Sequence, residues 1–176
     1  MDDGPTRYAV VENVCITSST AGLKVGHVVD QITVSNNIVL SYNTSISGTA
    51  FEVPKQPANN TNAFTKNVLV NMDYNNKPWQ FSSYCQQNNT TTPPPSTVDD
   101  NLYFARNKQK LKFCGSYDFW TTGLGLDKHS LFRVDPQLEN IDPGSEGYPF
   151  SIKVAEGSPA LLQLGFQNFK YGPRDG

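Results

Sequence analysis

The stretch "KNVLV" at residues 66–70 decides the fold, because its pattern of one asparagine before three apolar residues occurs four times in the chain. The other copies are "ENVCI" at 12–16, "NNIVL" at 36–40 and "DNLYF" at 100–104. Their asparagines, Asn13, Asn37, Asn67 and Asn101, are 24, 30 and 34 residues apart. A repeat of a few tens of residues is typical of proteins that stack one structural unit on the next.

A second apolar element follows in three of the four units. It reads "GLKVG" at 22–26, "GTAFEV" at 48–53 and "KPWQF" at 77–81. No segment of a dozen residues keeps a 3.6-residue period without interruption by Pro, Gly or β-branched residues, so we expect an all-β chain. Short strands between turns also fit a seven- or eight-stranded sandwich, but the repeated asparagine register favours a solenoid.

Stacking of the four asparagines would align the residues that follow them in columns. We expect two of these columns to point into the core. The first residues after the asparagines are Val14, Ile38, Val68 and Leu102, and the third residues are Ile16, Leu40, Val70 and Phe104. The intervening column, Cys15, Val39, Leu69 and Tyr103, would face the other way. Because it is also apolar, it predicts a covering loop or partner on that face. The asparagine amides, which both donate and accept, would form a hydrogen-bonded ladder.

The growing spacing has its source in two insertions, "PKQPANNTN" at 54–62 and "CQQNNTTTPPPST" at 85–97. Both are rich in residues that cannot join a ladder, and loops of this kind often carry function. We therefore expect one domain of coils over residues 1–120 with these two insertions, followed over 121–176 by a terminal coil and a C-terminal cap.

The composition excludes several classes of protein. The 176 residues carry a formal net charge of −2 without a long run of either sign, so a nucleic-acid or membrane-surface binder is not expected. No apolar stretch is long enough to span a bilayer, and residues 1–5 lack the features of a signal peptide. The early start of the strand pattern predicts a fragment, and we expect a monomer that needs no cofactor.

The last third of the chain carries a family resemblance. Its residues are "DDNLYF" at 99–104, Trp120, "GLDKHSLFRVDPQLEN" at 125–140, "YPFSIKVAEGSPALLQLGFQNF" at 148–169 and "GPR" at 172–174. In this order they resemble the last coils and cap of the secreted right-handed parallel β-helix family, which includes many carbohydrate-active enzymes. The segment "QLENIDPGSEGYP" is longer and more polar than in that family. The upstream coils match it only in style.

The resemblance implies a right-handed parallel β-helix and a secreted, extracellular protein. It also implies that residues 158–161 form a turn over the open end of the helix, and that Leu162, Leu164 and Phe166 cover the last coil. The function it implies is that of the C-terminal part of a protein related to glycoside hydrolases or polysaccharide lyases. Catalytic aspartates of that family usually sit on central coils, which would lie before residue 1 or at the very start of this chain.

One face of the predicted coils carries candidate site residues. The sixth residue after each ladder asparagine gives Ser19, Asn43, Asp73 and Asn107, which is a polar column with one carboxylate. Because a glycosidase needs two, the catalytic residues stay unknown. We expect carbohydrate binding by Asp73, Trp79 and Trp120, although either tryptophan could instead pack under a loop. The alternative function is a noncatalytic surface or matrix interaction module that binds a partner through the two insertions.

Two further groups of polar residues suggest chemistry. Asp99 and Asp100 precede a ladder asparagine and indicate a turn. Asp127, His129 and Ser130 contain the residue types of a nucleophilic triad, but residues so close in one turn rarely adopt its geometry, and we interpret them as a structural turn. Without a CxxC pair, and with only two histidines in the chain, a zinc site is not expected.

The cysteines and the sequons bear on secretion. A disulfide between Cys85 and Cys114 would close the second insertion and leave Cys15 unpaired. The alternative is three free buried thiols. Sequons at Asn43, Asn59, Asn88 and Asn89 would permit glycosylation of a secreted chain.

Overall fold

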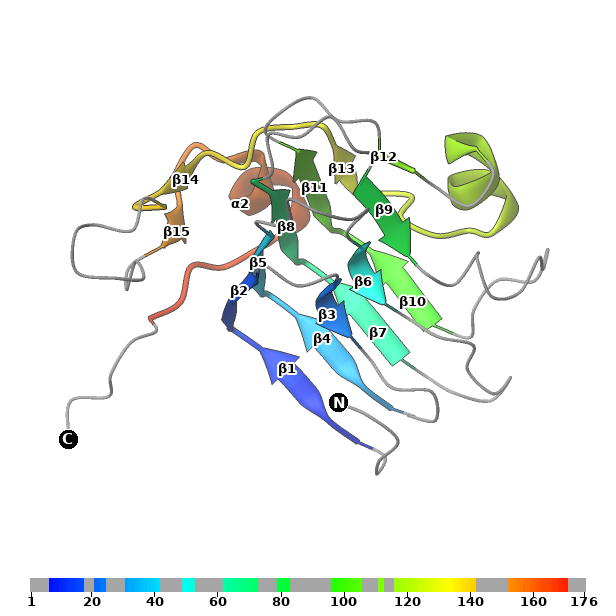
Figure 1. The fold of residues 1–176 in the computed structure, drawn as a ribbon, viewed down its shortest axis with the longest axis horizontal. Helices are drawn as coiled ribbons and strands as arrows, with labels where there is room; N and C mark the ends of the chain where they lie inside the picture. The colour runs from blue at the N-terminus through cyan, green and yellow to red at the C-terminus, as the bar shows by residue number, and fades with distance from the viewer. Residues whose placement is uncertain are drawn as a thin grey trace.

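The computed structural model describes residues 7–17, 21–24, 31–41, 49–52, 62–72, 79–82, 96–105, 111–112, 116–141 and 152–170. Over these residues the protein is built mostly of short β-strands in parallel sheets, with two short helices (Figure 1). Within the described part of the chain, neither helix is long and apolar enough to cross a membrane.

Each of four successive units contributes one strand to each of three parallel sheets. Sheet A has the order β1 (Ala9–Val11), β4 (Thr33–Ser35), β7 (Asn62–Thr65), β10 (Ser96–Asp99). Sheet B runs β2 (Val14–Thr17), β5 (Ile38–Ser41), β8 (Val68–Asn71), β11 (Leu102–Ala105), β13 (Leu131–Phe132). Sheet C runs β3 (Ala21–Lys24), β6 (Thr49–Glu52), β9 (Trp79–Ser82), β12 (Leu111–Lys112). This all-β, solenoid-like order excludes the sandwich alternative, whose sheets would be antiparallel.

The predicted stacking register is confirmed. Val14 pairs with Ile38, Ile38 with Val68 and Val68 with Leu102, so the residues after the ladder asparagines form one column across sheet B. The residue before each asparagine makes the bend from sheet A to sheet B. These residues have left-handed backbone conformations, with φ of 59° at Glu12, 55° at Asn36, 57° at Lys66 and 56° at Asp100.

The two faces of sheet B are opposite to the prediction. The column that begins at Cys15 points into the space between sheets A and B, where Val39, Leu69 and Tyr103 are buried against Val34 and Phe64. The columns predicted to point inward lie on the other face, against the C-terminal segment. Both faces of the sheet are apolar and both are buried, so alternation along the strands could not distinguish them.

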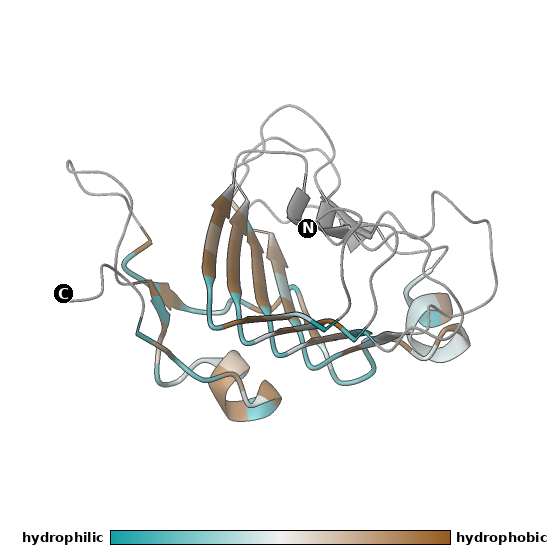
Figure 2. Ribbon diagram, turned by 90° about the horizontal axis from the view of Figure 1, so that it is seen from below, coloured by the Kyte–Doolittle hydropathy of each residue, from teal (hydrophilic) through white to brown (hydrophobic). Residues whose placement is uncertain are grey.

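The C-terminal segment covers the side of the stack rather than its end. Ser158 is the N-cap of α2 (Pro159–Leu164), and its hydroxyl accepts from the amide of Ala160 and donates to the carbonyl of Pro136. Leu164 and Phe166 are buried on sheet B, whereas Leu162 is 72% exposed. Figure 2 shows α2 outside the corner formed by sheets A and B, away from the interior between them. The predicted cap over the open end is therefore wrong.

The antiparallel pair β14 (Leu138–Glu139) and β15 (Lys153–Val154) accompanies this cover. Beyond α2, Gln167 joins the C-terminal segment to the second coil. Its backbone carbonyl and amide make two hydrogen bonds with the side chain of Asn36. The segment therefore spans several coils of the outer face of sheet B.

The end of the stack beyond β10 and β11 is closed by residues 116–132. This segment contains a π-helical turn, η1 (Phe119–Gly123), and places Trp120, Leu124 and Leu126 in the core between sheets A and B. Phe132 stacks on Tyr103 with ring centroids 5.1 Å apart. The indole of Trp120 thus serves the packing role that the sequence left open.

Both predicted insertions end in a strand. Asn62, assigned to the first insertion, is the first residue of β7, and its side-chain oxygen accepts the amide of Ile32 at 2.9 Å. Residues 96 and 97, assigned to the second insertion, begin β10. The other residues of the two insertions lie outside the described ranges.

Candidate functional site

The asparagine ladder runs the length of the described stack, and its hydrogen bonds all point the same way, from each asparagine to the asparagine of the next coil. The side-chain oxygen of each inner asparagine accepts both the backbone amide and the side-chain amide of the asparagine one coil earlier. For Asn37 and Asn67 these distances are 3.2 and 2.9 Å, and for Asn67 and Asn101 both are 3.0 Å. Asn37, Asn67 and Asn101 are 0% exposed, so the ladder satisfies polar groups that would otherwise be costly to bury.

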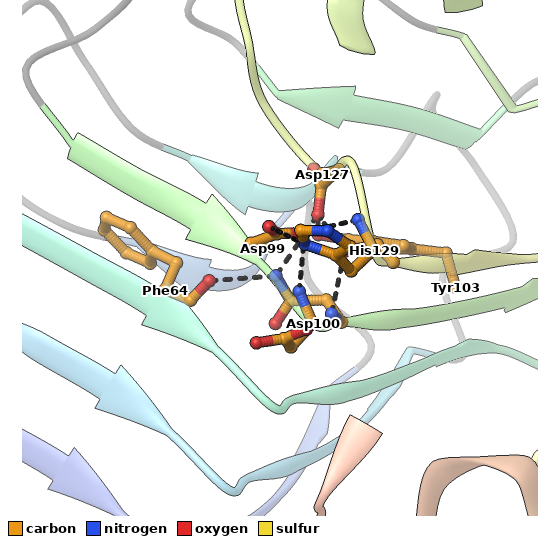
Figure 3. A network of polar contacts seen from close by, with 8 residues as sticks. Phe64, Asp99, Asp100, Tyr103, Asp127 and His129 are labelled. Atoms are coloured by element: carbon orange, nitrogen blue, oxygen red, sulfur yellow. Dashed lines mark hydrogen bonds and ion pairs between the residues drawn. The ribbon is translucent and has the colours of Figure 1, made fainter. Parts of the chain in front are cut away.

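Ser130 and Asp127 end the ladder. Leu131 pairs with Leu102 in sheet B and occupies the same position one coil further along. Ser130 therefore lies at the position that the next ladder asparagine would have. The hydroxyl of Ser130 accepts the backbone amide of Asn101 at 2.8 Å, and the carboxylate of Asp127 accepts its side-chain amide at 3.3 Å. Figure 3 shows the polar contacts around Asp127 at the end of the last full coil, on the side away from the earlier coils.

Asp127 is a fully buried carboxylate held by four neutral donors. Besides Asn101, these are the phenol of Tyr103 at 3.2 Å, the indole nitrogen of Trp120 at 2.9 Å and the hydroxyl of Ser130. Its own backbone amide donates to the carbonyl of Val98 at 2.6 Å, which ties the closing segment to sheet A.

Burial determines how these groups titrate. Removal from water raises the pKa of Asp127 to about 6, although the hydrogen bonds from its four donors oppose the shift. Burial, together with the nearby charge of Asp127, raises the pKa of Tyr103 well above its usual value, so the phenol remains a donor at neutral pH.

A second polar cluster lies at the surface beside the first. Nδ1 of His129 lies 2.7 Å from Oδ2 of Asp99, and the other carboxylate oxygen of Asp99 accepts the backbone amides of His129 and Asp100 at 2.7 and 2.9 Å. The imidazole is 74% exposed, whereas the side chain of Asp99 is only 22% exposed. Asp99 therefore clamps the turn that contains His129 to the end of β10.

These two clusters are separate, and they do not form a nucleophilic triad. The hydroxyl of Ser130 donates to Asp127, while His129 pairs with Asp99. A triad needs the serine and the carboxylate on the two nitrogens of one imidazole. The arrangement agrees with a structural turn at Asp127, His129 and Ser130, and it leaves the Asp99–His129 pair at the surface.

Asp99, Asp100 and His129 also offer three metal-ligand atoms within 4.8 Å of one another. Two carboxylates and an imidazole would suit a first-row divalent cation. Asp99, however, is already engaged by two backbone amides and by the imidazole, and these bonds account for its position as a clamp.

Of the three predicted carbohydrate-binding residues, only Trp120 has a side chain within the described part of the structure. Trp120 is 2% exposed and donates to Asp127, so it offers no ring face to a sugar. Trp79 begins β9, and its side chain lies outside the described part of the structure, as does all of Asp73. The cysteines proposed to pair, Cys85 and Cys114, and the sequon asparagines Asn43, Asn59, Asn88 and Asn89 also lie outside the described residues.

Sequence reasoning missed the fifth ladder position and its partners. The signal was present, because Ser130 precedes the apolar pair Leu131 and Phe132 as each ladder asparagine precedes its apolar triplet. The contacts of Tyr103 and Trp120 with Asp127 carried no such signal, since they depend on where η1 places the indole.

The chain matches no protein-family model, and it matches neither a curated protein nor a solved structure.

Proposed function

We propose that this chain forms terminal coils of a secreted right-handed parallel β-helix protein related to polysaccharide-degrading enzymes, with a glycoside hydrolase or polysaccharide lyase as the enzyme class. In these coils its role is that of a scaffold that binds a glycan across the outer face of sheet A. Two features support the fold assignment: each unit supplies one strand to each of three parallel sheets, and a buried asparagine ladder joins the units.

The outer face of sheet A is the observation that carries the binding proposal. Its inner column packs into the core, so the flanking residues of each strand face outward in two rows. The register gives these rows as Ala9, Thr33, Ala63 and Thr97, and as Val11, Ser35, Thr65 and Asp99. All eight side chains are short, and five of them are polar. The result is a face of short side chains on which hydroxyl groups occur in both rows.

Such a face suits an extended glycan. Ser35 and Thr65 lie on neighbouring strands, which are about 4.8 Å apart, whereas Thr33 and Thr97 lie two strands apart with Ala63 between them. Hydroxyls donate and accept, as do the hydroxyls of a sugar. Asp99, held beside His129, adds a charged group at one end of the second row.

The described residues support binding better than cleavage. Glycoside hydrolysis needs two carboxyl groups on opposite sides of the scissile bond. Asp99 and Asp100 are neighbours in one turn, and the carboxylate of Asp99 is used by the backbone amides of that turn and by His129. We therefore assign Asp99 and His129 to the binding face.

The test is retention of the protein by a panel of neutral and acidic polysaccharides in affinity gel electrophoresis. The double variant Thr33→Arg, Thr97→Arg places bulky side chains on two exposed positions of the face, and it should abolish the retardation. Thr122→Arg is the control, because Thr122 is also exposed but lies on η1. Thermal unfolding followed by circular dichroism shows whether each variant is folded.

The outcomes separate the functions. Retardation that the double variant loses and the control keeps supports glycan binding, and release of reducing ends would add cleavage to it. Absence of retardation with every polysaccharide would overturn the binding proposal and favour the noncatalytic module that binds another partner.

A further inference from the structure

Two carboxylates and one imidazole meet at the end of β10 (Figure 3). Asp99 is the last residue of the strand, Asp100 follows it, and His129 lies beside them on the closing segment. Each side chain offers one ligand atom, and the three atoms lie within 4.8 Å of one another. A zinc-like cation holds nitrogen and oxygen ligands at about 2.0–2.2 Å, which places two ligands about 3–4 Å apart. These side chains therefore need to approach one another by only about 1 Å to share an ion.

The two carboxylate oxygens of Asp99 have different partners. Oδ1 accepts the backbone amides of Asp100 and His129, and these two bonds hold the turn against β10. Oδ2 pairs with the imidazole, whose Nδ1 lies 2.7 Å away. A cation that replaces the proton between Nδ1 and Oδ2 therefore leaves both amide bonds intact. Because the imidazole is 74% exposed, its ring can turn toward an ion without disturbing the core.

The cluster also carries negative charge that its own groups do not balance. Asp99 and Asp100 are adjacent carboxylates, and the imidazole beside them supplies at most one positive charge. Among the described residues, no lysine or arginine forms an ion pair with either carboxylate. In the same part of the structure, the half-buried carboxylate of Asp100 has no hydrogen-bond partner. A divalent cation would balance this charge and give Asp100 a partner.

We propose that Asp99, Asp100 and His129 bind a first-row divalent cation of the Zn²⁺ type. The imidazole nitrogen favours such ions over Ca²⁺ and Mg²⁺, which prefer oxygen ligands throughout. The lack of a CxxC pair in the chain argues against a closed structural zinc site, but an open site needs no cysteine. With three protein ligands, the ion keeps at least one position for water or another small ligand.

The probe is Zn²⁺ alone, titrated into the full chain and followed by isothermal titration calorimetry. Saturable binding is expected, and Asp100→Asn should weaken it about tenfold or more. This variant keeps the clamp, because only the backbone amide of Asp100 donates to Asp99, and asparagine tolerates the left-handed φ of 56° at this position. Asp118→Asn is the matched control. It removes an exposed carboxylate of the closing segment and should change the affinity by less than about twofold.

The position of the ion is tested with paramagnetic Co²⁺, which shifts and broadens the nuclear magnetic resonance signals of nearby residues. The largest effects should fall on residues 98–101 and 127–130, and the signals of residues 9–16 should stay unchanged. Absence of saturable Zn²⁺ binding, equal affinity of the wild type and Asp100→Asn, or Co²⁺ effects centred on other residues would each overturn the proposal. Because the cation is titrated without polysaccharide, this proposal and glycan binding can fail independently of each other.

Discussion

The indole nitrogen of Trp120 donates to the carboxylate of Asp127 at 2.9 Å, and this bond joins the closing segment to the end of the asparagine ladder. The same carboxylate accepts from Asn101, so one side chain connects the π-helical turn, the ladder and sheet B. The end of the stack is thus sealed by a polar network with an apolar layer of Leu124 and Leu126 around it.

Replacement of Asp127 by alanine should lower the free energy of unfolding by about 3 kcal/mol or more, because it leaves several buried donors without an acceptor. Urea unfolding followed by tryptophan fluorescence measures the change. Asp118→Ala is the control, since Asp118 is exposed and its side chain makes no capping bond to η1. A loss under about 1 kcal/mol for Asp127→Ala would show that the network does not hold the end.

Stability should also depend on pH through Asp127. Its pKa is raised from 3.8 to about 6 in the folded state, so the folded protein binds this proton more tightly than the unfolded chain does. The contribution is therefore fully present below pH 4 and is lost as the pH rises through 6. Urea unfolding at intervals between pH 4 and 7 should show this decline in the wild type.

The variant Asp127→Asn is the control for the titration. It removes the ionisable group while keeping a side chain of the same size, so the decline between pH 4 and 6 should disappear even though the variant is less stable overall. An identical slope in the variant would assign the pH dependence to other groups.

The interior of the ladder should matter more than its exposed end. Asn67→Ala removes a buried side chain that donates to Asn101 and Val34 and accepts from Asn37, and we expect a loss of about 3 kcal/mol. Asn13→Ala makes the same change at an exposed position and should cost about 1 kcal/mol or less. Equal losses in chemical unfolding would argue against the ladder as a source of stability.

The cover on sheet B can be tested with two leucines of α2. Leu164 is 4% exposed and packs on the outer face of the sheet, so Leu164→Ala should cost about 2–4 kcal/mol. Leu162 lies on the same helix but is 72% exposed, and Leu162→Ala should stay within about 0.5 kcal/mol. Comparable losses for the two variants would mean that α2 does not lie on the sheet as described.

The ladder and the coil register could be predicted from the sequence because identical residues at corresponding positions signal stacking directly. The orientation of sheet B could not, since the column of Ile38 and the column of Val39 are both apolar and both buried. The place of the C-terminal segment was also out of reach. Leu164 and Phe166 indicate an apolar face, but their sequence does not say whether that face covers the end of the stack or its side.

The candidate site could be predicted only in part. Asp127, His129 and Ser130 were correctly assigned to a turn, because residues so close together rarely form a triad. The pairing of His129 with Asp99 depends on a contact across 30 residues, and the burial of Asp127 depends on Tyr103 and Trp120. Neither follows from local sequence.

The most direct test of glycan binding is a nuclear magnetic resonance titration of the isotope-labelled protein with oligosaccharides from the polysaccharides that retard it. Binding across sheet A predicts that backbone amide shifts concentrate in residues 9–11, 33–35, 62–65 and 96–99, with residues 116–123 unchanged. Shifts confined to other residues, or none at saturating oligosaccharide, would contradict the assignment of the outer face of sheet A as the binding surface.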